Sequence, residues 1–176
     1  KTTTKELIAA ALSASGTVLF TQGNHNTDVG LPLTVLESSE KEDYWVLEMA
    51  MRARGEIAYL ARLARPHVGV VTNVAGAHLE RLGSLDEVAR AKGELFHDLE
   101  RGGLAVLPAG EPRIEREAQH LPESRRLRFS LSPSEAAAVR VLDYIPAGPS
   151  GSVVRLAVGR TPVVVRLPLA GEHNAS

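Results

Sequence analysis

The stretch "HVGVVTNVAGAHLERLGSLDEVARAKGELF", residues 67–96, reads as a strand, a loop and a helix. Residues 67–74 form a largely apolar, valine-rich run, which is typical of a strand that is covered on both faces of a sheet. Ser84 and Glu87 have the S-x-x-E spacing of a capping box, which predicts that a helix begins after Ser84. Because apolar residues continue at helical spacing to Leu99, a strand–loop–helix unit is predicted here.

The predicted helix carries a lysine where its apolar face requires another apolar residue. Position 92 belongs to that face and holds Lys92. A lysine can pack its methylene groups and carry its ammonium to solvent, or it can form a buried ion pair. The third alternative is chemistry that requires a primary amine at this point. The other members of the face are Leu85, Val88, Ala89, Leu95, Phe96 and Leu99.

The rest of the first 133 residues alternates between strands and helices. Strands are predicted at 17–22, 43–50, 102–109 and 125–131, and helices at 2–13, 55–65 and 111–121. This alternation predicts an α/β fold in which a mainly parallel sheet has helices on both faces. After residue 133, apolar residues alternate with others between Gly and Pro turns, so residues 134–170 are expected to form a small antiparallel sheet.

Composition restricts the possible classes of protein. With 176 residues, 44% of them hydrophobic, the chain has the size of one well-packed domain. A net charge of −1 argues against binding to nucleic acid, and no apolar run is long enough to insert in a membrane. The absence of cysteine excludes disulfides and thiolate metal sites, and we expect a cytoplasmic protein. Only four of the 20 basic residues are lysines, so Lys92 is a rare residue type in this chain.

The two ends of the chain lead us to expect a segment of a longer protein. The first predicted helix begins at Thr2, and no closing element follows residue 170. We therefore expect a central domain, residues 1–176, that is truncated at both ends. It would consist of a nucleotide-binding core, 1–133, and the appended strands, 134–170.

Two segments carry candidate residues for phosphate and metal binding. Lys1, Thr2 and Thr3 open a helix as the last residues of a phosphate-binding loop do, although the glycines of such a loop would precede Lys1. Many ordinary helices also begin with Lys-Thr. Glu48 lies near the C-terminal end of the strand predicted at 43–50, where nucleotide-binding enzymes hold Mg²⁺; a solvated carboxylate is the alternative.

The loop after residue 74 adds His78. No HxH or HExxH spacing supports zinc, so a metal that His78 binds together with carboxylates and phosphate would resemble Mg²⁺ or Mn²⁺. The carboxyl ends of parallel strands meet at one edge of a sheet. Most of the five candidates are therefore expected to lie near that edge: Lys1, Thr2, Glu48, His78 and Lys92.

Six stretches resemble a known family, in the family's order and over nearly the whole chain. They are "KTTTKE" (1–6), "GNHNTDVGLPLT" (23–34), "VLEMAMRARGEI" (46–57), "TNVAGAHLERLGS" (72–84), "AKGELF" (91–96) and "LAGEHNAS" (169–176). On these motifs the chain is similar to the central ATP-binding domain of the Mur ligases of peptidoglycan synthesis. The resemblance implies a P-loop-type sheet, ATP and Mg²⁺ or Mn²⁺ as cofactors, and a flanking N-terminal UDP-substrate domain and C-terminal ligase domain in the same chain.

Within the family, "EMAMRARGEI" resembles the branch that joins D-Ala-D-Ala to UDP-MurNAc-tripeptide. The resemblance implies that ATP phosphorylates the terminal carboxylate of the tripeptide and that the amine of D-Ala-D-Ala attacks the acyl phosphate. Divalent cations and positive groups are needed because anions must approach one another. The resemblance further implies a monomer, and an isolated segment that lacks ligase activity.

The resemblance also implies roles for particular residues. Lys1 would contact the β- and γ-phosphates and Thr2 would bind their Mg²⁺, while Glu48 and His78 would help to hold metal. Lys92 falls where the family carries a lysine that CO₂ converts to a carbamate. Carbamylation requires the free amine, and burial favours it by lowering the pKa of a lysine.

Further implied contacts lie in two other motifs. Asn24 or Asn26 would lie near the γ-phosphate or the acyl site, and the motif does not distinguish between them. His173 and Asn174 would lie against adenine. The chain departs from the pattern at Thr27, where a second asparagine is expected.

Three alternatives remain open at this point. A sister ligase, such as MurE, cyanophycin synthetase or folylpolyglutamate synthase, would use the same ATP chemistry on another substrate. A nucleotide-binding module without catalysis would not require Thr2, Glu48, His78 and Lys92 together. A P-loop kinase would explain the N-terminal motif but leaves residues 72–96 unexplained.

Overall fold

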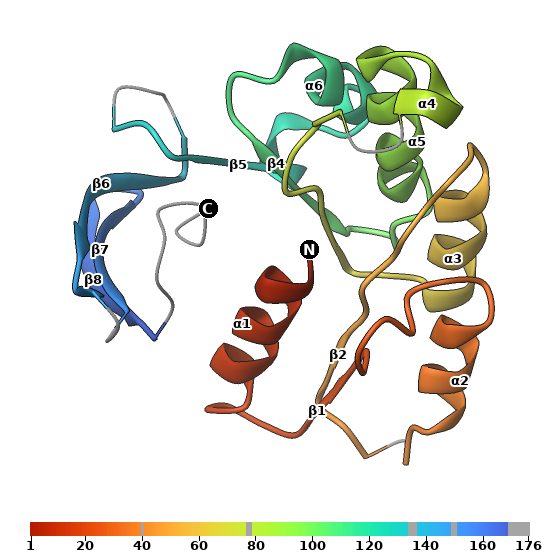
Figure 1. Cartoon of the computed structure of the whole chain (residues 1–176), viewed down its shortest axis with the longest axis horizontal. Coiled ribbons are helices and arrows are strands. Elements are labelled where there is room, and N and C mark those ends of the chain that lie inside the picture. Colours follow the sequence, from red (N-terminus) through yellow and green to blue (C-terminus); the bar gives the residue numbers. More distant parts are fainter. Residues whose placement is uncertain (40, 77–78, 134–136, 149–150, 169–176) are drawn as a thin grey trace.

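The computed structural model describes residues 1–39, 41–76, 79–133, 137–148 and 151–168 (Figure 1). The helices are α1 (Thr2–Leu12), α2 (Gly30–Leu36), α3 (Glu56–Ala64), α4 (Leu79–Leu82), α5 (Leu85–His97) and α6 (Pro112–Ala118), with a 3-10 turn at Glu123–Arg125. The strands are β1 (Val18–Phe20), β2 (Tyr44–Val46), β3 (Val68–Val70), β4 (Leu104–Pro108), β5 (Arg126–Ser130), β6 (Val139–Pro146), β7 (Ser152–Val158) and β8 (Thr161–Leu167).

The strands form two sheets. β1 and β2 pair in parallel, and a six-stranded sheet has the order β3-β4-β5-β6-β7-β8. Pairing is parallel from β3 to β6 and antiparallel from β6 to β8. The predicted α/β fold with C-terminal antiparallel strands is confirmed. These strands are not a separate sheet, because β6 pairs with the end of β5, and they extend to one side of the helices (Figure 1).

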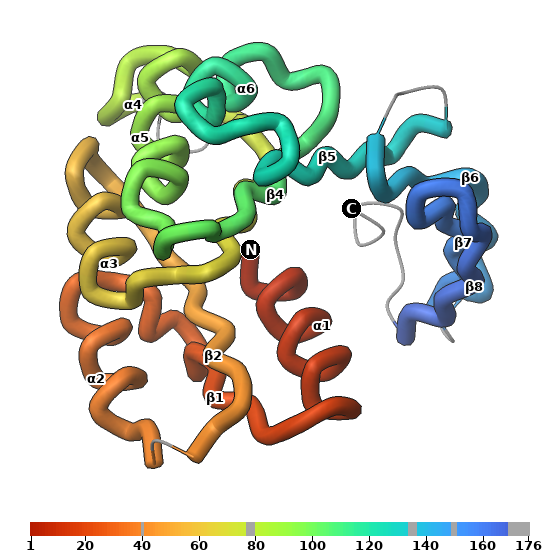
Figure 2. The backbone as a smooth tube through the Cα atoms, turned by 180° about the vertical axis from the view of Figure 1, so that it is seen from behind, coloured from red at the N-terminus to blue at the C-terminus, as the bar shows by residue number. Residues whose placement is uncertain are grey.

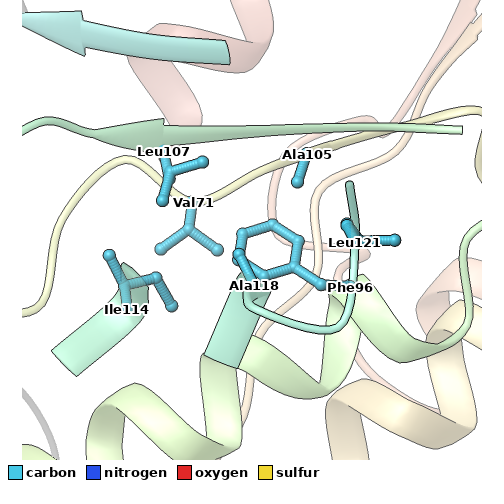
Figure 3. Packing of buried hydrophobic residues seen from close by; sticks show 7 residues of the cluster. All are labelled: Val71, Phe96, Ala105, Leu107, Ile114, Ala118 and Leu121. Atoms are coloured by element: carbon cyan, nitrogen blue, oxygen red, sulfur yellow. The ribbon is translucent and has the colours of Figure 1, made fainter. Parts of the chain in front are cut away.

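Helices cover the parallel strands. Figure 2 shows α1 on one side of the β1–β2 pair and α2 and α3 on the other, which confirms the prediction of helices on both faces. α5 and α6 pack on the β3–β5 sheet and enclose the main hydrophobic core, in which Phe96 and Leu107 are almost completely buried (Figure 3). The other members of this core are Val71, Ala105, Ile114, Ala118 and Leu121.

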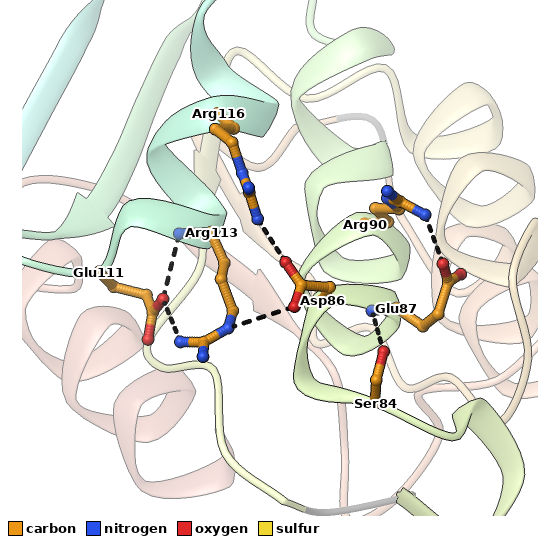
Figure 4. A network of polar contacts seen from close by, with 7 residues as sticks. All are labelled: Ser84, Asp86, Glu87, Arg90, Glu111, Arg113 and Arg116. Carbon is orange, nitrogen blue, oxygen red and sulfur yellow. Dashed lines mark hydrogen bonds and ion pairs between the residues drawn. The ribbon is translucent and has the colours of Figure 1, made fainter.

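The N-terminus of α5 is fixed by its predicted cap and by α6. The Ser84 Oγ accepts a hydrogen bond from the Glu87 backbone N–H at 3.2 Å, which confirms the capping prediction. The Asp86 carboxylate pairs with Arg113, at 3.7 Å, and with Arg116, both on α6 (Figure 4). α5 therefore has a defined position relative to α6 and to the sheet beneath it.

The strand predicted at residues 43–50 is shorter and more exposed than expected. β2 covers only Tyr44–Val46, and Trp45 is 42% exposed. Within the described residues β2 pairs with β1 alone, so it is an edge strand. Residues 47–50 follow without regular secondary structure, and this segment carries Glu48.

Among the described residues, no helix combines the length and the apolar character that crossing a membrane requires.

Candidate functional site

Glu48 is the acidic centre of the candidate site. It lies two residues beyond β2 and is only 7% exposed. Its Oε1 accepts a hydrogen bond from the Asn26 Nδ2 at 2.8 Å, whereas its buried Oε2 has no hydrogen-bond partner among the described residues. A buried carboxylate oxygen without a partner is unfavourable, and a bound cation would remove this cost. The Glu48 carboxylate is therefore suited to act as a metal ligand.

The loop before α2 distinguishes the two candidate asparagines. Asn26 is half-buried, and besides its bond to Glu48 its carbonyl oxygen accepts from the Ala50 N–H at 2.7 Å. Asn24 is exposed, and its backbone carbonyl oxygen accepts from the Asn26 backbone N–H. Asn26 thus holds the segment that carries Glu48.

The start of α1 lies beside the same segment. The Lys1 Nζ donates to the carbonyl oxygen of Met49, the residue after Glu48, at 3.5 Å. Thr2 and Thr3 are exposed in the first turn of α1, where backbone N–H groups and the helix dipole favour anions. The expected proximity of the helix start and Glu48 is therefore observed.

Lys92 points toward this region and is not fully exposed to solvent. Its Nζ donates to the backbone oxygen of Asn73 at 2.6 Å and to the Asn73 Oδ1 at 3.2 Å. Burial lowers the pKa of Lys92 below its ordinary value, and the positive charge of nearby Lys1 lowers this pKa further. Lys1, which contacts the Glu48 segment, is thus close enough to Lys92 for its charge to act on the Lys92 ammonium.

Sequence reasoning missed two residues that hold Glu48 in place. Thr21 is fully buried just after β1, and its Oγ1 accepts from the Glu48 N–H at 2.9 Å. The Thr21 carbonyl oxygen in turn accepts from the buried Nζ of Lys5 at 2.6 Å. The only available signal was that Thr21 directly follows an apolar strand, at the edge where ligands commonly bind.

Three predicted site residues lie outside the described residues, namely His78, His173 and Asn174. No group of three or more His, Cys, Asp and Glu side chains suitable for a metal occurs in the described part of the chain. Mg²⁺ commonly takes one or two carboxylates and completes its octahedron with waters and substrate phosphates. The single buried carboxylate of Glu48, with the start of α1 in contact with the next residue, is consistent with that type of site.

This arrangement, a lysine at a helix start beside a buried acid, agrees with the result of comparison with known families. The model of the Mur ligase middle domain matches residues 1–176. The chain belongs to the Mur ligase middle-domain family.

Individual relatives and solved structures support this family assignment. The UDP-N-acetylmuramoyl-tripeptide–D-alanyl-D-alanine ligase of Escherichia coli K12 is 39% identical over 99% of this chain and 38% of its own length. The crystal structure of MurF from Acinetobacter baumannii superimposes with a TM-score of 0.87 at 32% identity, over 98% of this chain and 37% of that one. MurF of Thermotoga maritima, solved in complex with ADP, matches with a TM-score of 0.81 at 30% identity, over 94% of this chain and 37% of that one. The chain thus spans less than two fifths of these relatives.

Proposed function

We propose that the protein to which this segment belongs is an ATP-dependent ligase that joins D-Ala-D-Ala to UDP-MurNAc-tripeptide. The observation that carries the proposal is the position of Lys1, which contacts the Glu48 segment and acts electrostatically on Lys92. The 39% identity to an enzyme named for this reaction supports the choice of substrates. N- and C-terminal domains in the same chain are part of the proposal. We also propose a cytoplasmic location, because ATP is supplied there.

The phosphate groups of ATP would bind at the start of α1. In this proposal Lys1 neutralises the β- and γ-phosphates, and the first N–H groups of α1 donate to them. The Thr2 hydroxyl and the Glu48 Oε2 would hold Mg²⁺, together with His78. When bound, the metal screens phosphate charge and stabilises charge that develops during phosphoryl transfer. Asn26 would act by fixing Glu48, which leaves Asn24 as the asparagine free to approach phosphate.

A phosphate loop would reach Lys1 from a further strand. Within the described residues β2 pairs only with β1 and β3 only with β4, so each presents one unpaired edge. A parallel strand between these two edges would join both sheets and lead into α1. Our proposal therefore includes a strand and a glycine-rich loop immediately before Lys1.

Lys92 is proposed to work as a carbamate. The neutral Nζ attacks the carbon of CO₂, an electron pair of one C=O bond moves to oxygen, and Nζ loses a proton to solvent. The product is an anion, so its interaction with the Lys1 ammonium becomes attractive where that of the Lys92 ammonium is repulsive. The lowered pKa of Lys92 supports this step, because it increases the fraction of reactive amine. At the other end of the nucleotide, His173 and Asn174 would contact adenine.

The proposal is tested on the full-length protein by phosphate release from ATP. Release is expected with UDP-MurNAc-tripeptide and D-Ala-D-Ala together, and Lys92→Ala is expected to abolish it in the absence of added bicarbonate or formate. Release only with glutamate or another single amino acid would refute the choice of substrate and favour a sister ligase. Unchanged turnover of Lys92→Ala would refute the carbamate, and the absence of turnover with every acceptor would favour a nucleotide-binding module.

A further inference from the structure

We propose that Asn73 is the residue that positions Lys92 in both of its forms, as an ammonium and as a carbamate. This inference rests on the proposed carbamylation of Lys92 and goes beyond it by assigning a partner. Asn73 lies three residues after the end of β3, in the described segment that runs to Gly76.

Both sides of this contact are held by packed structure. On the lysine side, Val88 and Phe96 lie one turn away on α5 and are almost completely buried. On the asparagine side, the Val71 N–H donates to the Val106 carbonyl oxygen at 2.9 Å and extends the pairing of β3 with β4. The Lys92–Asn73 contact thus joins two fixed elements.

The partners of the Lys92 ammonium are neutral. Its two hydrogen bonds, at 2.6 and 3.2 Å, go to the backbone and side-chain oxygens of Asn73. No ion pair found among the described residues includes Lys92. A carboxylate at this position would favour the charged ammonium and oppose its conversion. Asn73 holds the amine in place without that penalty.

The carboxamide of Asn73 can also serve the carbamate. After carbamylation Nζ keeps one hydrogen, which suffices for the shorter bond to the Asn73 backbone oxygen. Oδ1 then loses its donor, and the new carbamate oxygens require donors. A half-turn of the amide replaces Oδ1 by Nδ2, which donates to a carbamate oxygen. A carboxamide both accepts and donates, whereas a carboxylate only accepts and would repel the carbamate.

Asn73→Asp is the decisive variant, because it has nearly the same shape as the wild type. In the full-length protein with ¹³C-labelled bicarbonate, wild type is expected to show a carbamate ¹³C signal that Lys92→Ala lacks. Asn73→Asp is expected to show at least tenfold less of this signal and to require more bicarbonate for activity. Asn73→Ala, which retains the backbone oxygen, is expected to fall between the two. Gln119→Glu makes the same amide-to-acid change at an exposed position after α6 and should retain the full signal.

The outcomes separate this inference from the proposed function. If wild type lacks the carbamate signal, both the proposed carbamate and the proposed role of Asn73 are refuted. If wild type shows the signal and folded Asn73→Asp matches it, only the role of Asn73 is refuted. Thermal unfolding of each variant identifies any loss caused by misfolding, and Asn73→Ala provides the comparison if Asn73→Asp does not fold.

Discussion

Gly93 sets the distance between α5, which carries Lys92, and α6. A Cβ added at Gly93 would lie 2.4 Å from the Glu117 Cβ and 2.6 Å from its Cγ. Carbon atoms in ordinary contact are about 3.5–4.0 Å apart, so α6 would have to move by about 1 Å. Replacing glycine inside a helix by alanine gains about 1 kcal/mol, but overpacking costs about 1–3 kcal/mol. Because the clashing Cβ is fixed to the α6 backbone, we expect Gly93→Ala to destabilise the protein by about 1 kcal/mol.

A double-variant cycle tests the cause of this effect. Glu117→Gly removes the clashing carbon, so in that background Gly93→Ala should stabilise the protein by about 1 kcal/mol. The two backgrounds would then differ by about 2 kcal/mol, well above the deviation from additivity seen between distant sites. Urea unfolding followed by circular dichroism measures all four proteins. Stabilisation by Gly93→Ala in the wild-type background would refute the close approach of the helices.

Three further predictions concern a cap, the acidic centre and a surface carboxylate. Ser84→Ala removes the cap of α5 and should lower the free energy of unfolding by about 1 kcal/mol, as measured in urea. Asn26→Ala leaves both buried oxygens of Glu48 without a protein donor and should cost about 1–3 kcal/mol in urea without Mg²⁺, with less cost when Mg²⁺ and ATP are present. Hydrogen bonds, foremost from the Ser39 hydroxyl, lower the pKa of Glu42 from 4.5 to about 2. Because the folded pKa is depressed, this contribution to stability is complete above pH 4.5 and is lost as the pH falls toward 2. An NMR titration midpoint of Glu42 near 4.5 would contradict the last prediction.

The helix that carries Lys92 could be predicted because its information is local. The capping box at Ser84 and the apolar periodicity both concern residues within four positions of one another. The burial of Ala91 and Gly93 could not be predicted in this way, because neither belongs to the apolar face. They are buried because α3 and α6 pack against α5, and small residues allow that approach. Periodicity describes one face of a helix and does not reveal how many neighbours surround it.

The surroundings of Glu48 show the same limit of prediction from local sequence. An acid after an apolar run indicated the position of Glu48, because the end of a strand is a local feature. That Asn26, and not Asn24, is the partner of Glu48 depends on a contact across 22 residues, and the sequence alone does not distinguish the two asparagines. Likewise, the Thr21 hydroxyl accepts a hydrogen bond from the Glu48 N–H, which is 27 residues away in the sequence. Partners at such separations are determined by the sheet, which brings β1 and β2 together.

Three of the four lysines lie at or near the candidate site. Lys5 is buried and its Nζ donates to the Thr21 carbonyl oxygen. Thr21 in turn holds the Glu48 backbone N–H, so Lys5 helps to position Glu48 through Thr21. Lys1 contacts the residue after Glu48, and its charge acts on Lys92. An arginine at position 92 would remain charged and could not react with CO₂. Under the proposed function, three of the four lysines would serve one site, where a compact or reactive amine is the property that arginine cannot provide.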